Sequence, residues 1–546
     1  MKKTLLYIPL LAGVLAVSSC TPTSSENSDS TSISTSYGVE TVEKLSPEIY
    51  KAGNNFSLIR KNQGFHDLGT FGEKEILIIP TEFEDALAAD LPGGAEHIRS
   101  EIETAFFGTA GEDLPWESLS SFYQESSYGQ LTLTGEVTDW WNTGYTLAEM
   151  AAKGGGTATK ILVSEALAWY KGLHGEASTQ RFDKDGDGYV DAIYFVYSAP
   201  IGGNPETEAD DDMFWAFVYW TSDSPRVESP NGHNYMWASW EFMYENGRYL
   251  PNGQYLDWTE TEIALGTAKV DAHTFIHESG HLMGLEDYYT YDSTDTTNGL
   301  EGTDYGALGG LDMMDYNIGD HNAWSKWILG WATPYWVKDT ATITLKPFVT
   351  SGESILLAGP DYAYEHLSEY IMLEYVTGKG LTERDSKQRF AGAYPLFYSE
   401  PGLRVMHVDA RLAKYVYRSD EYQFSKYATI STAPNWGTSY TGLAHSNTAS
   451  SNDEDANYKL ISLIESSGVN TLAQEIEVEF NDGSQGKGYY NRASNESLFH
   501  VGDSFGLTTY QNYTLHSGAA LGFTFEVLEM TPAGVTIQIT KLPVVA

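Results

Sequence analysis

Two histidines and a glutamate stand at a spacing that suits zinc chemistry, within residues 277 to 287, HESGHLMGLED. On a helix, a separation of four residues puts His277 and His281 on one face, where both imidazoles can bind one zinc ion. Glu278 can then act as general base on a zinc-activated water without being a ligand itself. A catalytic zinc needs three protein ligands and an open fourth position, so the motif requires one more ligand nearby.

That third ligand is expected just beyond the helix. Residues 270 to 283 contain no proline, and Thr267 is the expected N-cap. Gly284 can adopt a positive φ, end the helix and turn the chain so that Asp287 swings back toward the metal. Glu286 stands beside Asp287 and is the alternative third ligand. His273 lies one turn before the motif, and a core or surface histidine is favoured there over one that supports the ligands.

Residues 309 to 317, GGLDMMDYN, supply a second element that such a site needs. We predict a tight turn that places Met314 beneath the metal, with ordinary core packing of Met313 and Met314 as the alternative. Tyr316 follows at the offset where several zinc peptidases place a tyrosine that hydrogen-bonds the developing oxyanion. It is the predicted second catalytic group beside Glu278.

Residues 183 to 191, DKDGDGYVD, resemble a calcium loop. Its ligands would be four carboxylates and one carbonyl, from Asp183, Asp185, Asp187, Tyr189 (carbonyl) and Asp191. Position 12 of the loop is Tyr194 rather than glutamate, and the residues after the loop read as a strand. We therefore expect a structural Ca²⁺ loop rather than an EF-hand, with a solvated acidic turn as the alternative.

The elements around these motifs alternate between strand and helix. Apolar runs predict strands at 75–80 and 130–137, and helical periodicity predicts helices at 95–106, 119–128 and 157–173. This alternation predicts an α/β or α+β core. The aromatic residues at 215–220 and 237–240 are expected to pack in that core, with the lining of a substrate cleft as the alternative.

After about residue 335 the pattern changes to short apolar strands between Gly, Ser and Asn clusters. The last of them, 522–540, predicts a hairpin. We therefore divide the chain into a leader at 1–20, a disordered Ser/Thr-rich tether at 21–45, a catalytic domain at 46–335 and a β-rich C-terminal region at 336–546. A C-terminal region that is continuous with the catalytic domain is the alternative.

The N-terminus predicts export. Two lysines precede an apolar run that is too short to span a membrane, and the run ends in Val-Ser-Ser-Cys20. This resembles the lipobox of bacterial lipoproteins, in which the cysteine carries the lipid, with a plain secretory signal as the alternative. Cys20 is the only cysteine, so no disulfide is possible within the chain. The net charge of −43 argues against nucleic acid as a partner.

Together, HESGHLMGLED, LDMMDYN and NAWSKWILGW resemble the immune inhibitor A family of secreted bacterial zinc metallopeptidases. The resemblance covers roughly residues 70 to 410, including FYQESSYGQLTLTGEV and GLRVMHVD. It implies a metzincin-like α+β catalytic domain, in which a twisted mixed sheet carries the active-site helix. It also implies zinc bound by His277, His281 and Asp287. Leu311 stands where a tryptophan is common, and Glu286 replaces a usual proline.

The resulting expectation is a zinc-dependent endopeptidase that cleaves extracellular proteins or peptides, with Zn²⁺ and Ca²⁺ as cofactors. We expect a monomer, exported and held at the outer face of a bacterial cell membrane only by its lipid, with a released form as the alternative. A catalytically silent surface binding protein and a hydrolase of non-peptide amides are the competing functions. Residues 37 to 70 could form a pro-segment whose His66 or Asp67 blocks the zinc.

Overall fold

The structure is a computed structural model, and most of the chain from residue 66 onward is described in it. The described residues are 42–44, 66–111, 114–203, 211–221, 223–250, 252, 254–290, 306–360, 362, 366–392, 394–418, 421–426, 439–448, 458–472, 474, 476–479, 485–488 and 492–543. Cys20 and nearly all of the predicted tether lie outside them. Within these ranges, no helix has the length and apolarity that a membrane crossing requires.

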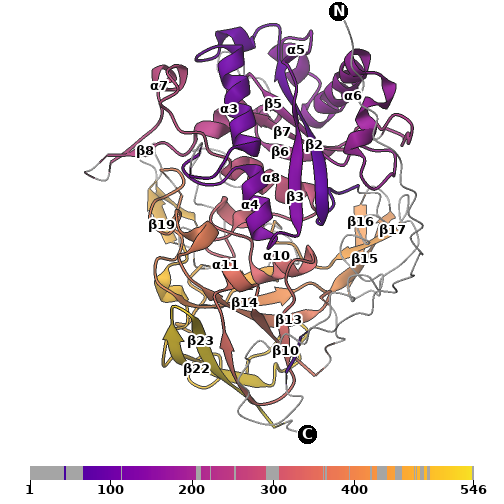
Figure 1. Cartoon of the computed structure of the whole chain (residues 1–546). Helices are drawn as coiled ribbons and strands as arrows, with labels where there is room; N and C mark the ends of the chain where they lie inside the picture. Colours follow the sequence, from indigo (N-terminus) through magenta and orange to yellow (C-terminus); the bar gives the residue numbers. More distant parts are fainter. Residues whose placement is uncertain are drawn as a thin grey trace, which may run out of the picture.

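A twisted mixed sheet forms the upper half of the molecule (Figure 1). Its strands follow the order β3-β2-β5-β7-β6, and only β6 runs antiparallel to its neighbour. Their bounds are Leu131–Val137 (β3), Gly72–Glu82 (β2), Ile193–Tyr197 (β5), Asn234–Ser239 (β7) and Phe217–Trp220 (β6). The two strands predicted at 75–80 and 130–137 are confirmed as β2 and β3.

Alternate residues of the central strand β2 face two different cores, as the pleat requires. Ile76 and Ile78 pack with α3, α4 and α8, the helix that carries the HESGH motif, on one face. Leu77 and Ile79 pack with α6 on the other. The long helices run over Ala95–Phe107 (α3), Leu119–Ser126 (α4), Gly155–His174 (α6) and His273–Leu282 (α8). The helices predicted at 95–106, 119–128 and 157–173 are thus confirmed, and α4 ends two residues early.

Two further sheets stack in the lower half of the molecule (Figure 1). The larger follows the order β1-β10-β12-β13-β14-β18 and the smaller β11-β23-β22-β21. The larger comprises Val42–Lys44 (β1), Tyr335–Val337 (β10), Ser354–Ala358 (β12), Glu369–Val376 (β13), Gly402–Asp409 (β14) and Ile461–Leu463 (β18). The smaller comprises Ala341–Leu345 (β11), Gly534–Lys541 (β23), Phe523–Thr531 (β22) and Ser504–Phe505 (β21). The predicted hairpin at 522–540 is confirmed as β22 and β23.

The larger sheet also has two buried faces. Ile355 and Ile371 meet the smaller sheet. Leu356 and Met372 instead belong to the same apolar cluster as α3, α4 and α8. One core therefore runs without a break across residue 335. The strand β1 lies near the end of the predicted tether and pairs with β10 of the larger sheet. Residues 42–44 are therefore ordered in a strand, whereas the sequence predicted disorder there.

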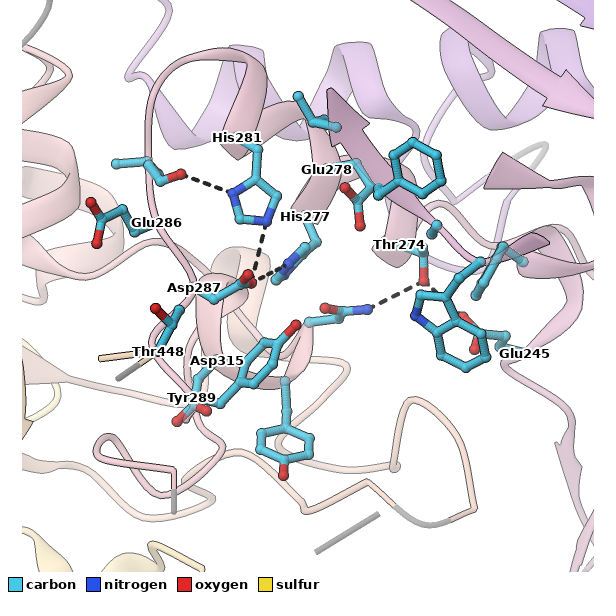
Figure 2. A pocket seen from close by; sticks show the side chains of 18 of the residues that line it. Glu245, Thr274, His277, Glu278, His281, Glu286, Asp287, Tyr289, Asp315 and Thr448 are labelled. Carbon is cyan, nitrogen blue, oxygen red and sulfur yellow. Dashed lines mark hydrogen bonds and ion pairs between the residues drawn. The ribbon is translucent and has the colours of Figure 1, made fainter. Parts of the chain in front are cut away.

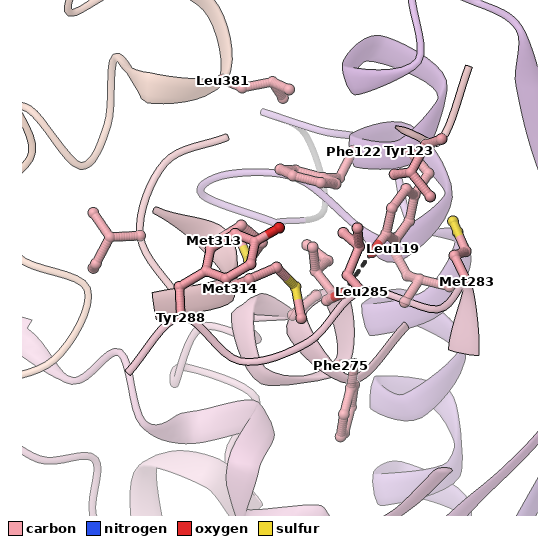
Figure 3. Close-up of a cluster of buried hydrophobic side chains, with 14 of the residues drawn as sticks. Leu119, Phe122, Tyr123, Phe275, Met283, Leu285, Tyr288, Met313, Met314 and Leu381 are labelled. Carbon is pink, nitrogen blue, oxygen red and sulfur yellow. Dashed lines mark hydrogen bonds between the residues drawn. The ribbon is translucent and has the colours of Figure 1, made fainter. Parts of the chain in front are cut away.

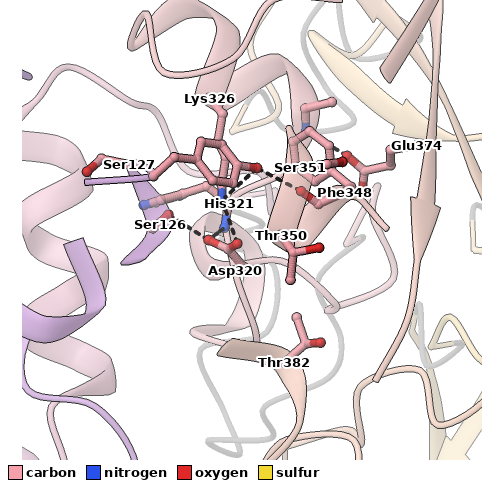
Figure 4. A network of polar contacts seen from close by, with 12 residues as sticks. Ser126, Ser127, Asp320, His321, Lys326, Phe348, Thr350, Ser351, Glu374 and Thr382 are labelled. Atoms are coloured by element: carbon pink, nitrogen blue, oxygen red, sulfur yellow. Dashed lines mark hydrogen bonds and ion pairs between the residues drawn. The ribbon is translucent and has the colours of Figure 1, made fainter. Parts of the chain in front are cut away.

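A buried polar network also joins the two halves (Figure 4). Ser126 at the end of α4 donates to Asp320 Oδ1, and Lys326 Nζ lies 2.6 Å from Asp320 Oδ2. From β13, Glu374 accepts the amide of Ala323. Other short elements comprise Trp141–Asn142 (β4), Leu147–Ala151 (α5), Arg248–Tyr249 (β8), Tyr255–Leu256 (β9), Glu260–Ala264 (α7), Met313–Tyr316 (α9), Ala323–Ile328 (α10), Phe348–Ser351 (α11), Leu412–Arg418 (β15), Glu421–Lys426 (β16), Ser439–Leu443 (β17), Ile476–Glu479 (β19) and Gln485–Gly488 (β20).

Candidate active site

Helix α8 carries the HESGH motif, and its N-cap lies five residues later than predicted. Ala272 is its N-cap, whereas Thr267 bonds to Glu262 O after α7, so the prediction that Thr267 caps α8 is wrong. Asp271 supplies the side-chain oxygen that accepts the His273 amide. Beyond the helix, Gly284 has a φ of 97°, which confirms the predicted turn.

The turn brings Asp287 back onto both histidines, as the sequence predicted. Asp287 Oδ1 lies 2.9 Å from His277 Nε2 and 3.2 Å from His281 Nε2 (Figure 2). The three ligand atoms lie within 4.8 Å of one another and form a group that could hold a metal ion. Glu286 points away from the imidazoles in Figure 2, so the geometry places Asp287, not its neighbour, in the third position.

The protonation of this group suits a metal. His277 Nδ1 contacts Met313 O at 2.7 Å, and His281 Nδ1 contacts Leu285 O at 2.8 Å. A carbonyl oxygen only accepts, so each Nδ1 carries a proton, and each Nε2 faces Asp287 Oδ1, where it would present a lone pair to a bound metal. Burial works against ionisation of Asp287, but His281 and His277 hold its pKa well below the ordinary range. Two imidazoles and one carboxylate are a donor set that zinc accepts.

Glu278 is buried beside the group without belonging to it. It is 6 % exposed, and its Oε2 makes no hydrogen bond to any described residue. Burial raises the pKa of its carboxyl group. A buried carboxylate that lacks a protein partner at one oxygen is placed to accept a proton from a water molecule and to return it.

The predicted methionine turn packs directly beneath α8 (Figure 3). Helix α9 is a single turn capped by Asp312, whose side chain accepts the amide of Met314. A methyl group on Gly280 would lie 2.4 Å from Met314 Sδ, so only glycine allows this approach. Met313 O also accepts a hydrogen bond from His277 Nδ1, so the turn holds both the helix and one imidazole in position.

The candidate site opens into a cleft of about 1270 Å³. His277, Glu278, His281 and Asp287 line it, together with the edge strand β6. Within the described sheet, β6 pairs only with β7, so its second edge faces away from the sheet. Trp215 is 55 % exposed in this lining, and the expectation that residues 215–220 pack in the core is wrong for it.

Two tyrosines share the lining. Tyr316, predicted from the sequence, lies under the guanidinium of Arg492, which is 4.4 Å from its ring centre. Tyr289 was not predicted, and its ring centre is 6.0 Å from that of Tyr316. Figure 2 shows its hydroxyl directed toward His277. Only its position two residues after Asp287 could have drawn attention to it.

His273 is a core histidine, as favoured from the sequence. It is fully buried and stacked between Trp116 and Phe390, with ring centres 3.8 and 4.2 Å away. Its Nδ1 lies 2.6 Å from Asp271 and its Nε2 lies 3.2 Å from Asp385. Both ring nitrogens are therefore engaged by carboxylates, and His273 joins α8 to the segment that precedes β14.

The acidic loop gathers some of the predicted calcium ligands. Asp183, Asp185 and Asp191 form a second group that could hold a metal ion. Asp187 is not in that group, and its Oδ2 lies 2.5 Å from His66 Nδ1. The hydroxyl of Tyr189, whose carbonyl is the fifth predicted ligand, donates to Asp223 O.

The end of the predicted pro-segment is built into the fold. His66 reaches the acidic loop, and the amide of Asn234 lies 3.5 Å from Asp67 Oδ1. Leu68 is 1 % exposed, and its amide donates to Leu282 O at the end of α8. These contacts make residues 66 to 68 part of the same folded half of the molecule as α8.

No protein-family model matches this chain, and no curated protein is similar to it at a significant level. The interpretation of the site therefore rests on its geometry and on the motifs in the sequence.

Proposed function

We propose that the protein is a zinc-dependent endopeptidase. The observation that carries the proposal is the convergence of His277 Nε2, His281 Nε2 and Asp287 Oδ1 beside the buried carboxyl of Glu278, at the wall of an open cleft. A zinc ion held by the three residues would supply Lewis acidity, acidifying a water molecule and polarising a carbonyl group.

The remaining steps belong to the side chains. Glu278 takes the proton of the attacking water, and it later delivers a proton to the departing amine. The hydrogen bonds from the two Nδ1 atoms to Met313 O and Leu285 O hold the imidazoles in the required tautomer and orientation. The hydroxyl of Tyr316 donates to the developing oxyanion, and Tyr289 is a second candidate for this role.

The edge strand supports a polypeptide as substrate. The second edge of β6 can form main-chain hydrogen bonds with an extended peptide added as a further strand. Trp215 and Phe217 of the lining would contact side chains of that peptide. Such binding uses the backbone that every peptide shares, and it favours an endopeptidase over a hydrolase of small amides.

The proposal is tested by hydrolysis of casein with the full chain, with and without a chelator, while zinc is measured on the same samples. Glu278→Gln should lower kcat by about 10²- to 10⁴-fold and leave the zinc content unchanged, because it removes the base but not a ligand. Glu286→Gln is the matched control, since it neutralises a carboxyl of the same cleft that points away from the imidazoles. Full zinc content without any chelator-sensitive cleavage by the wild-type chain would favour a silent binding protein.

We also propose Ca²⁺ for the group of Asp183, Asp185 and Asp191. Oxygen ligands in a turn suit calcium, and the ion would compete with Lys74, whose Nζ lies 3.2 Å from Asp191. A calcium-dependent rise in the unfolding temperature that Asp183→Asn abolishes would support it. Export with a lipid on Cys20 remains a proposal from the sequence, and loss of fatty-acid labelling in Cys20→Ser tests it.

A further inference from the structure

A second group of histidines and carboxylates lies in the C-terminal region, far along the chain from the HESGH motif. Glu369 begins β13 and pairs with Asp409 at the end of β14. His407 lies two residues before Asp409 and so faces the same side of the sheet. His516 comes from the segment between β21 and β22 and closes the group.

The ligand atoms of this C-terminal cluster, defined as Glu369, His407 and His516, converge like those of the candidate active site. They lie within 4.8 Å of one another. Glu369 Oε1 is 2.9 Å from His407 Nε2 and 4.0 Å from His516 Nδ1. Tetrahedral ligands with bonds of about 2.0–2.1 Å are about 3.3 Å apart, which lies between these two values.

Neighbouring groups orient the cluster. Tyr513 Oη lies 2.9 Å from His407 Nδ1 and can accept a hydrogen bond from it. The other ring nitrogen, Nε2, faces Glu369 and could then bind a metal. Glu369 also accepts the backbone amides of His516 and Ser517, so it holds the loop that brings the third ligand. The hydrogen bonds of Tyr513 and of the two backbone amides thus hold His407 and Glu369 in position.

The charge also matches that of a metal site. Arg411 forms two contacts of 2.6 Å with Asp409, one to each carboxylate oxygen, and its guanidinium also lies 3.5 Å from Glu369 Oε2. His445 Nε2 and His516 Nδ1 lie 3.2 and 3.0 Å from Asp409 Oδ2. Once Asp409 is paired with Arg411, the cluster retains one carboxylate and two imidazoles, the same donor set as at α8.

We propose that Glu369, His407 and His516 bind a second divalent transition ion, zinc, with a structural role. Imidazole nitrogen and carboxylate oxygen together suit zinc better than calcium or magnesium. None of the three residues lines the cleft, and the ion would instead tie the segment around His516 to strands β13 and β14. Binding there would stabilise the fold through the preference of the ion for the folded state.

The test counts zinc per folded full-length chain after dialysis against a metal-free buffer. We expect about two ions in the wild type and about one after His516→Gln, because His516 supplies one of three ligands. The matched control is His500→Gln, a histidine of the same region outside the cluster, which should keep both ions. Unchanged zinc content in His516→Gln and Glu369→Gln would overturn the proposal and leave a hydrogen-bonded network.

A complementary variant separates this proposal from the proposed peptidase. His277→Gln/His281→Gln removes the α8 ligands and leaves the C-terminal cluster intact, so it should retain about one zinc ion. Titration of that variant with Co²⁺ should give ligand-field absorption in the visible range that the further change Glu369→Gln abolishes. If the α8 double variant binds neither Zn²⁺ nor Co²⁺, the second site does not exist, whatever the activity of the wild-type chain.

Discussion

The α8 cluster and the C-terminal cluster each bring two imidazoles and one carboxylate together, but their surroundings differ. At α8 the group lines an open cleft and has Glu278 beside it. In the C-terminal cluster the neighbours are Tyr513, Asp409 and Arg411, and the three residues lie outside the cleft lining. The comparison teaches that the donor set fits a metal, whereas an adjacent base and room for a substrate fit catalysis.

The largest expected difference between the clusters concerns hydrolysis. Asp287→Ala removes a ligand and should lower hydrolysis at least about 10³-fold with loss of one zinc ion, since the remaining two imidazoles bind metal weakly. Glu369→Ala should lose one zinc ion as well and yet keep the activity of each folded molecule within about twofold. Casein hydrolysis per folded chain, with folding checked by circular dichroism, measures both. Equal losses of activity would break the distinction between the two sites.

A third group, around His273, sharpens the comparison because both ring nitrogens of this imidazole contact carboxylates and neither is open to a metal. Burial opposes protonation, but the charges of Asp271 and Asp385 raise the pKa of His273 above its ordinary value. His273→Gln should therefore destabilise the fold by about 3–5 kcal/mol, the usual cost of breaking a buried ion pair. Its zinc content should remain that of the wild type, and a loss of zinc would contradict the structural role.

The same group sets a pH dependence. Because the folded pKa of His273 is raised, its contribution to stability is complete below about pH 6.5 and disappears as the pH rises through the folded pKa. The difference in unfolding free energy between wild type and His273→Gln should shrink as the pH increases from neutral to alkaline. Denaturant unfolding at a series of pH values measures it, and a constant difference would show that the ring acts only through packing.

A smaller effect is expected at the oxyanion position. Tyr316→Phe should lower kcat by about tenfold with little change in KM, because a hydroxyl that donates only in the transition state does not hold the substrate. Tyr289→Phe is the companion variant from the same lining, and its hydroxyl is directed toward His277 in Figure 2. A larger loss in Tyr289→Phe than in Tyr316→Phe would transfer the role to Tyr289.

The contrast between the clusters also explains how much the sequence could predict. His277, His281 and Asp287 lie within eleven residues, so helical spacing and the glycine turn were enough to place them together. The C-terminal ligands come from positions 369, 407 and 516, and only sheet register and a distant loop unite them. No local spacing encodes such a group, and the HVD segment at 407–409 was the only signal.

The same difference between local spacing and contacts of distant segments decided which parts of the fold could be predicted. Strands and helices with a strong period were predicted within a few residues, and so was the final hairpin. The start of α8 was misplaced because Asp271, engaged with His273, supplies the first side-chain acceptor instead of Thr267. A continuous core of the two halves was only an alternative from the sequence, because the shared core depends on which face of the sheet β1-β10-β12-β13-β14-β18 meets α8.

The smallest expected effect concerns substrate charge. Among the described residues of the cleft lining, the acidic and basic side chains other than histidine are all carboxylic, namely Glu245, Glu278, Glu286, Asp287 and Asp315, and burial raises the pKa of Asp315 to about 7. A peptide with lysines flanking the cleaved bond should therefore have a kcat/KM about threefold to tenfold above that of the same peptide with glutamates. Glu245→Gln should reduce this preference, since Glu245 lies outside the proposed zinc ligands and its carboxylate accepts a hydrogen bond from Thr274.

The salt dependence of the substrate preference distinguishes the summed charge of the cleft from a direct contact with Glu245. The Debye screening length falls from about 10 Å at 0.1 M salt to about 3 Å at 1 M salt. A preference that arises from the summed charge of the cleft should therefore nearly vanish at the higher concentration. A preference that survives 1 M salt but is lost in Glu245→Gln would instead place one substrate lysine directly against Glu245. The C-terminal cluster lies outside the cleft, so Glu369→Gln should leave the preference unchanged. If that variant altered it, the two regions would not be independent, and the separation between a catalytic and a structural ion would fail.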